Sequence, residues 1–217
     1  DSSSSRGLGD VYKRQPRAGS VRLDERAVTG GAVPASMRAA MQIVLQDPYG
    51  SFNPRHRVER LVAEPFHLIA DAPQGAARKY AVVAALEAVG MTASDADKYI
   101  HEFSGGQRQR IAIARALVIR PKLIILDEAV SALDVSIRAQ ILDLLAELRD
   151  SHGLAYLFIS HDLGVVTSIT DRVMVMKDGE IVEHGPTADV MGAPAHGYTR
   201  ELVAARPQIP PEWSPDL

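Results

Sequence analysis

Residues 103–117 read FSGGQRQRIAIARAL, and this stretch decides how the rest of the chain is interpreted. Apolar residues from Ile111 onward recur at helical spacing, which predicts a helix. Ser104 is of a type that caps helix N-termini, while Gly105 and Gly106 let backbone amides approach a phosphate. The helix dipole adds partial positive charge at the same end. We therefore predict a helix start built to bind an anion; the alternative is an ordinary capped surface helix.

The composition is that of a soluble globular domain. The 217 residues are 46% hydrophobic and 24% charged, with a net charge of −3, which gives no general electrostatic basis for binding nucleic acid. The chain has no cysteine, which excludes disulfides, cysteine-ligated zinc and iron–sulfur clusters. It also has no run of 18 apolar residues, so no membrane-spanning helix is predicted within it.

Polar residues follow directly after two short apolar runs of the sequence. The run before Asp127 and Glu128 reads as a strand buried on both faces, as in parallel sheets. The run at residues 155–159 reads as the next buried strand and leads into His161. Ligands of open α/β sheets bind at the carboxyl ends of strands, so we expect these side chains at one sheet edge. The alternatives are a solvated strand end and a structural histidine.

Other segments give a coarse map of the chain. Gln46 follows a third apolar run, at residues 41–45, and opens a turn-rich loop; alone, it is equally a surface glutamine before a turn. Ser104 lies 58 positions after Gln46, with helical spacing over residues 58–89 between them. The remaining predictions are an amphipathic helix over residues 137–148 that stops at His152-Gly153, and a hairpin of residues 172–176 and 180–182 joined by Asp178-Gly179.

Taken together, these motifs resemble those of the ATP-binding-cassette (ABC) ATPases. They occur in the family's order and at ordinary spacing, and the resemblance covers Pro16 to about Pro207. The matching motifs are the Q-loop at Gln46, the signature at Ser104-Gly105-Gly106-Gln107, Walker B at Asp127-Glu128, the D-loop at Ser131–Asp134 and the switch histidine at His161.

The resemblance implies catalytic roles for Glu128, His161 and Gln46. It also implies ATP and Mg²⁺ as cofactors. Glu128 would orient or deprotonate the attacking water, while His161 would contact the γ-phosphate and hold Glu128 in register. Asp127 would hold the Mg²⁺ shell. Gln46 would bind Mg²⁺ or orient water as its loop moves.

The resemblance also implies an ATP site shared between two subunits. Ser104, Gly105, Gly106 and Gln107 would face the γ-phosphate held by a second ABC ATPase subunit, identical or different. Asp134, in the D-loop, would also contribute to ATP binding. The signature helix of one chain would thus complete the site of its partner.

The fold implied is an α/β, P-loop NTPase-like ABC ATPase core, with a parallel sheet, flanking helices and a small helical subdomain. The spacing from Gln46 to Ser104 suits that subdomain and is too short for a long coiled-coil insertion. The expected divisions are a leader at residues 1–15, the start of the core at 16–46, the helical subdomain with the signature at 47–121, the rest of the core at 122–206 and a tail at 207–217.

Details of the sequence resemble the peptide and nickel importers of the family. Gln46-Asp47-Pro48-Tyr49 and the later Asn53-Pro54-Arg55 match that branch except for Phe52, and residues 194–199 match except for Gly197. The resemblance implies a peripheral subunit at the cytoplasmic face of the bacterial inner membrane. Permease subunits would dock on its Q-loop and helical subdomain, and an extracytoplasmic solute-binding protein would act indirectly. The alternatives are a non-transport ABC ATPase of translation or repair, and a module that only offers its signature in trans.

One family motif is absent: no Gly-x-x-x-x-Gly-Lys-Ser/Thr phosphate loop (Walker A) occurs in the sequence. Residues 5–15 resemble the translation of a sequencing adapter, so we expect residues 1–15 to be a non-native leader and the natural sequence to begin near Pro16. The phosphate-loop strand and helix are then expected to be missing. We expect an exposed apolar sheet surface, poor solubility and negligible ATPase activity from this chain alone.

Overall fold

The structure is a computed structural model that describes residues 18–23, 25–27 and 33–205. The expected leader at residues 1–15 and the expected tail at residues 207–217 lie outside the described residues. Within the described part of the chain, no helix is both long and apolar enough to cross a bilayer.

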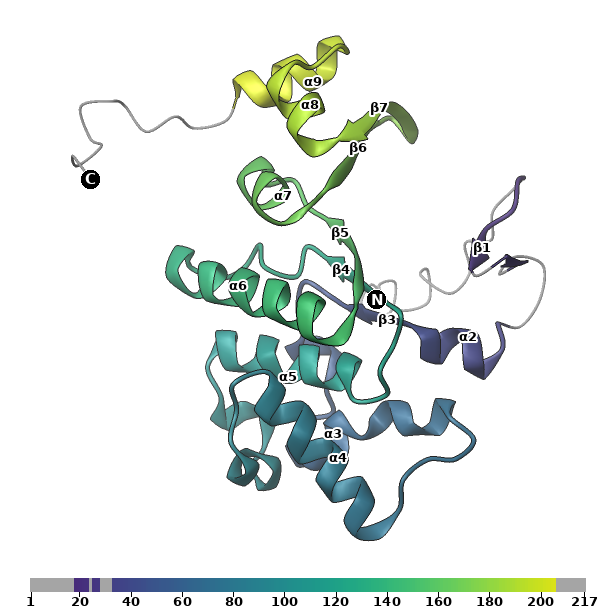
Figure 1. Cartoon of the computed structure of the whole chain (residues 1–217). Coiled ribbons are helices and arrows are strands. Elements are labelled where there is room, and N and C mark those ends of the chain that lie inside the picture. Colours follow the sequence, from purple (N-terminus) through teal and green to yellow (C-terminus); the bar gives the residue numbers. More distant parts are fainter. Residues whose placement is uncertain (1–17, 24, 28–32, 206–217) are drawn as a thin grey trace, which may run out of the picture.

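A three-stranded parallel sheet positions the residues of interest (Figure 1). Its strands are β3 (Met41–Val44), β4 (Leu123–Asp127) and β5 (Ala155–Ile159), in the order β3-β4-β5. Ile125 of β4 lies beside Ile43 on one side and Leu157 on the other. Because all three strands run in the same direction, their carboxyl ends meet at one edge of the sheet.

The two faces of this sheet differ in burial. Val44, Ile124 and Leu126 are fully buried on one face, where α5 (Gly105–Leu117) and α6 (Val135–His152) join the same core. On the other face, Ile43 is 48% exposed and Ile159 is 46% exposed. The prediction that the strands are buried on both faces is therefore wrong for β5, whose Leu157 is 39% exposed, while the second face of β4 is half-buried. An exposed apolar sheet surface is nevertheless what the sequence led us to expect.

Helices fill the segment between β3 and β4. The short 3-10 turn η1 (Tyr49–Ser51) lies in the loop after Gln46, and helices form between residues 58 and 89 as predicted, with Gly90 at a φ of 75° after the last. Val62, Leu86 and Ile111 are among the fully buried side chains of this group. Its elements are α3 (Val58–Val62), η2 (Glu64–Leu68), α4 (Gly75–Ala88), η3 (Ala93–Asp97), η4 (Ile100–Glu102) and α5.

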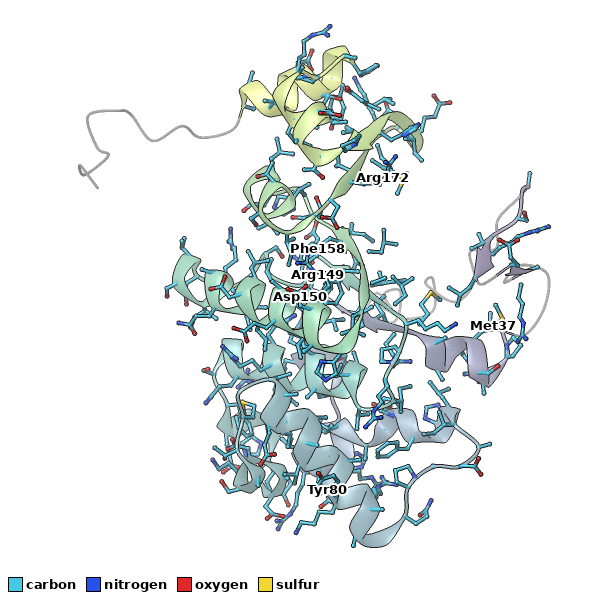
Figure 2. The ribbon with its side chains drawn as sticks, viewed as in Figure 1. Met37, Tyr80, Arg149, Asp150, Phe158 and Arg172 are labelled. Atoms are coloured by element: carbon cyan, nitrogen blue, oxygen red, sulfur yellow. The ribbon has the colours of Figure 1, made fainter. Side chains whose placement is uncertain are left out.

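Smaller elements lie before β3 and after β5. The predicted hairpin forms, and both turn residues have left-handed backbones, with φ of 51° at Asp178 and 85° at Gly179. Figure 2 shows the side chains, including the buried Met37 and the 78% exposed Tyr80. The elements are β1 (Arg22–Leu23), β2 (Arg26–Ala27) and α2 (Ala35–Ala40), then α7 (Leu163–Ile169), β6 (Arg172–Lys177), β7 (Glu180–Pro186), α8 (Thr187–Gly192) and α9 (Gly197–Ala204).

The difference between the faces predicts unequal costs for two similar truncations. Ile124→Ala removes a fully buried side chain and should lower the free energy of unfolding by about 2–5 kcal/mol. Ile43→Ala acts on a side chain that is 48% exposed and should cost roughly 1 kcal/mol or less. Urea unfolding followed by circular dichroism measures both values. Equal costs would show that the second face is covered in solution.

Candidate active site

The carboxyl edge of the sheet brings Glu128 and His161 together. Glu128 follows the last residue of β4, and His161 lies two residues after β5. The His161 Nδ1 atom is 3.1 Å from the Glu128 Oε1 atom. The side chains remain accessible, Glu128 at 33% exposure and His161 at 72%, so both can meet a ligand from solvent.

Glu128 has an unusual backbone. Its φ of 48° lies in the left-handed region, which few residues other than glycine adopt. The Glu128 N–H donates to the Ile159 carbonyl at 2.9 Å, while its own carbonyl accepts from the Ser131 hydroxyl at 2.8 Å and the Ser131 N–H at 3.0 Å. Three hydrogen bonds therefore hold a strained conformation, as is common where a side chain must be aimed.

Gln46 reaches this cluster indirectly. Its Nε2 atom donates to the Ser131 hydroxyl at 3.2 Å, and that hydroxyl bonds the Glu128 carbonyl. Ser131 is thus the link between the Q-loop and Glu128, a role that the sequence did not reveal. The available signal was its position three residues after Glu128, where a turn brings a hydroxyl back to a carbonyl.

The residues proposed for a metal do not form a ready-made metal cluster. Among the described residues, no three His, Cys, Asp or Glu side chains gather as a metal site. The half-buried Asp127 side chain makes no hydrogen bond or ion pair to any described residue. One carboxylate with an amide oxygen such as that of Gln46 suits Mg²⁺, which keeps several waters and takes further oxygens from phosphates. Asp127 and Gln46 would each offer an oxygen to a Mg²⁺ that arrives with a nucleotide.

Asp134 is the N-cap of α6. Its Oδ1 atom accepts from the Ile137 N–H at 2.9 Å and from the Ser136 hydroxyl at 2.9 Å. These donors, the Ile137 N–H foremost, stabilise the carboxylate and hold the pKa of Asp134 below its usual value. The contacts of Asp134 within this chain are therefore those of a helix cap, and its role toward a nucleotide stays a prediction.

The signature stretch forms the predicted capped helix. The Ser104 hydroxyl accepts from the Gln107 N–H at 3.4 Å, and the Gln107 side chain accepts from the Ser104 N–H at 3.0 Å. The two glycines differ, however. A Cβ added to Gly105 would meet nothing within 4 Å, whereas one on Gly106 would lie 2.6 Å from Ile137 Cγ2. Gly106 is needed for close packing of α5 on α6, so its interpretation as a phosphate-approach residue is incomplete.

Two arginines of α5 fasten the Q-loop to the signature helix. Arg115 donates to the Ser51 carbonyl at 3.1 Å and to the Ser51 hydroxyl at 2.9 Å, and lies over the Phe52 ring. Burial lowers the pKa of the Arg115 guanidinium. The Glu64 carboxylate, whose Oε2 atom lies 3.5 Å from Arg115 Nη1, acts in the opposite direction. Arg108 lies over the Tyr49 ring at 4.8 Å. The sequence signal that was missed is their spacing of seven, which places both on one helix face.

Comparison with known proteins agrees with these motifs. The family model described as ABC transporter matches residues 11–131. The chain is 48% identical over 177 residues to the dipeptide transport ATP-binding protein DppF of Haemophilus influenzae, covering 82% of this chain and 54% of that protein. It is 53% identical over 175 residues to the glutathione import ATP-binding protein GsiA of Salmonella choleraesuis, covering 81% of this chain and 28% of that protein. The chain thus spans about half or less of these relatives.

A solved structure shows the same fold. The dimeric ATP-binding cassette MJ0796, in a post-hydrolysis state bound to ADP and Pi, superposes with a TM-score of 0.70 at 26% identity, covering 80% of this chain and 75% of that one. The parallel sheet with its helices is therefore an ABC ATPase cassette fold. Since the family model matches more than half of the residues, the chain belongs to the ABC transporter family.

Proposed function

We propose that the chain is part of the ATP-binding and ATP-hydrolysing subunit of an ABC importer for peptides, nickel or similar small solutes. The contact between Glu128 and His161 carries the hydrolytic part of the proposal. The importer part is supported by the names of the dipeptide and glutathione relatives. A non-transport ABC ATPase is the alternative, and permease genes beside the coding sequence would favour import.

Glu128 is the proposed base for the attacking water. Because His161 meets Glu128 through Nδ1 and its side chain is 72% exposed, Nε2 would face a phosphate oxygen. A carboxylate and a phosphate oxygen are both acceptors, so an imidazole that bridges them must carry a proton on each nitrogen. His161 would then stabilise charge on the phosphate while holding Glu128 toward the water.

Gln46 and Asp127 are the proposed ligands of the Mg²⁺ that accompanies ATP. The hydrogen bonds from Gln46 to Ser131 and from Ser131 to the Glu128 carbonyl connect the Q-loop to the backbone of the proposed base. Mg²⁺ would supply charge neutralisation on the phosphates. Movement of the Q-loop would in turn shift Ser131 and thereby Glu128.

The remaining proposed contacts involve a second ABC ATPase subunit. Ser104, Gly105, Gly106 and Gln107 would face the nucleotide of that subunit, and Asp134 would adjoin it. The dimeric state named for MJ0796 supports this arrangement. The signature helix has its cap in place in this chain alone, which favours a second candidate function as a module that offers the signature in trans.

The proposed docking surface for permease subunits lies beside the Q-loop. Two adjoining cavities of about 560 Å³ and 440 Å³ share His56, Arg60 and Arg78, and Ser51 lines the larger one. The protein would sit at the cytoplasmic face of the inner membrane through the permease, and the solute-binding protein would act from the other side. Nucleic acid is not a proposed partner.

The absence of a phosphate loop from the sequence limits what this chain does alone. Such a loop supplies charge-assisted hydrogen bonds of about 1.5–3 kcal/mol each, so three of them contribute roughly 5–9 kcal/mol. Binding with micromolar affinity amounts to only about 8 kcal/mol. Without those bonds, useful ATP affinity at this chain's own site is not expected.

The purified 217-residue chain should therefore show negligible ATPase activity. The product of the complete gene should hydrolyse ATP, and Glu128→Gln should abolish that turnover because the base is lost. Phosphate release is measured for the 217-residue chain and for the product of the complete gene, each with and without Glu128→Gln. Turnover by the 217-residue chain that Glu128→Gln removes would contradict its predicted inactivity, and an inert complete protein would contradict the proposed function.

The role in trans predicts different outcomes for the two signature glycines. Gly105→Ala adds a methyl group in open space, so the chain should stay folded but crosslink less to an ATP-bound Glu128→Gln partner made from the complete gene. Gly106→Ala should lower stability, because Ile137 must move. Crosslinking yield and urea midpoints separate these effects. Unchanged crosslinking of the Gly105 variant would argue against the role in trans.

A further inference from the structure

The side chain of His161 makes few contacts that would fix its position. It is 72% exposed, and its one recorded hydrogen-bond partner among the described residues is Glu128. An exposed imidazole on a freely moving backbone would sample many positions. The place of His161 beside Glu128 must therefore be set by the backbone on either side of it.

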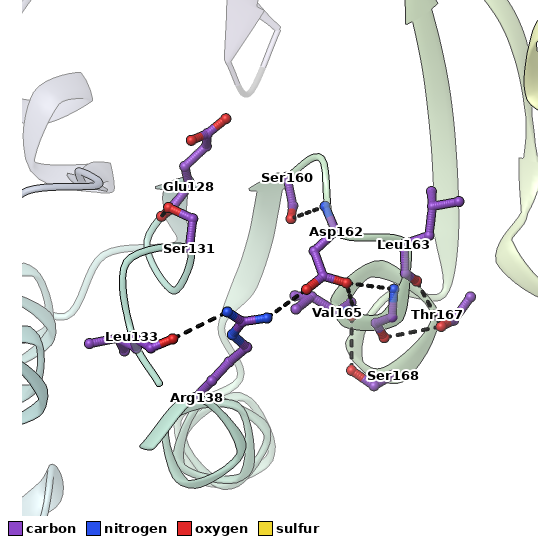
Figure 3. A network of polar contacts seen from close by, with 11 residues as sticks. Glu128, Ser131, Leu133, Arg138, Ser160, Asp162, Leu163, Val165, Thr167 and Ser168 are labelled. Atoms are coloured by element: carbon purple, nitrogen blue, oxygen red, sulfur yellow. Dashed lines mark hydrogen bonds and ion pairs between the residues drawn. The ribbon is translucent and has the colours of Figure 1, made fainter. Parts of the chain in front are cut away.

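The sheet ends two residues before His161, at Ile159, and the backbone after His161 is fixed by Asp162. The Asp162 Oδ1 atom caps α7 by accepting from the N–H groups of Gly164 at 2.8 Å and Val165 at 3.3 Å. Its N–H donates to the Ser160 hydroxyl at 3.0 Å. Figure 3 shows this carboxylate turned toward both α7 and Arg138.

Arg138 of α6 forms an ion pair with Asp162, and we call this pair the anchor. The Arg138 Nη1 atom donates to Asp162 Oδ2 at 2.7 Å, and its Nη2 atom donates to the Leu133 carbonyl at 3.2 Å. The Arg138 side chain is only 25% exposed, and its Nε atom is buried without a partner in the described structure. One guanidinium thus joins the loop of residues 131–134 to the residue that follows His161.

We propose that Arg138 is a positioning residue that holds His161 within reach of Glu128 by fixing Asp162. Through Leu133 it also ties that position to the loop of residues 131–134. The functional meaning rests on the proposed roles of Glu128 and His161. A displacement of this loop, such as docking of a second subunit would cause, would reach His161 through Arg138 and Asp162.

The test uses the 217-residue chain labelled with ¹⁵N-histidine. Long-range ¹H–¹⁵N spectra report which ring nitrogen carries the proton, and His161→Gln assigns the signal. Contact with the Glu128 carboxylate favours a proton on Nδ1, whereas an exposed neutral histidine usually carries it on Nε2. We expect His161 to show the Nδ1–H form in the unchanged chain and to lose it in Glu128→Gln.

Two variants break the anchor with little other change. Asp162→Asn keeps an oxygen that caps α7 but removes the ion pair, and Arg138→Met keeps the apolar stem. Both should lower the Nδ1–H fraction of His161 and leave the other six histidines unchanged. Arg138→Lys should restore part of that fraction. Arg149→Met, which removes an exposed ion pair from the same helix, is the matched control and should have no effect on His161.

Each contrary result overturns the proposal. A His161 signal that is unchanged in both anchor variants would show that its place does not depend on Arg138. Changes in all seven histidines would show that the pair serves the fold as a whole, and an unchanged signal in Glu128→Gln would remove the premise. Because these spectra need no ATP, they can fail independently of the turnover measurements.

Discussion

The parallel register of β4 and β5 is the constraint on which the site depends. Asp127 lies beside Ile159, and the next N–H, that of Glu128, donates to the Ile159 carbonyl. At that point the chain enters a left-handed conformation and turns its carboxylate toward His161. Hydrogen bonds from Ser131 stabilise this strained backbone. The loop after β4 is therefore part of the site and not merely a connection.

Polar links extend from this centre to two more distant parts of the chain. Gln46 bonds Ser131, while the Q-loop beyond it is fastened to α5 by Arg115 at Ser51. On the other side, Arg138 joins the loop of residues 131–134 to Asp162. Identifiable side chains therefore connect α5, the Q-loop and His161, and under the proposed function they would link partner contacts to hydrolysis.

Local patterns in the sequence predicted much of this arrangement. Capping and periodicity located α5, and apolar runs located the three parallel strands, because these depend on near neighbours in the chain. The exposed second face of β5 could not be predicted from its apolar run, since burial depends on which helices cover a sheet. The packing role of Gly106 also escaped prediction, because Ile137 lies 31 positions away and meets it only in the folded chain. The ion pair of Arg138 with Asp162 is hidden for the same reason.

The central claim is that Glu128 and His161 act as one hydrolytic unit. The most direct measurement is a double-mutant cycle of Glu128→Gln and His161→Ala on the ATPase rate of the product of the complete gene. The account predicts that the double variant is little slower than the slower single variant, because each change already disables the shared unit. Independent effects, with the two losses multiplying in the double variant, would contradict it.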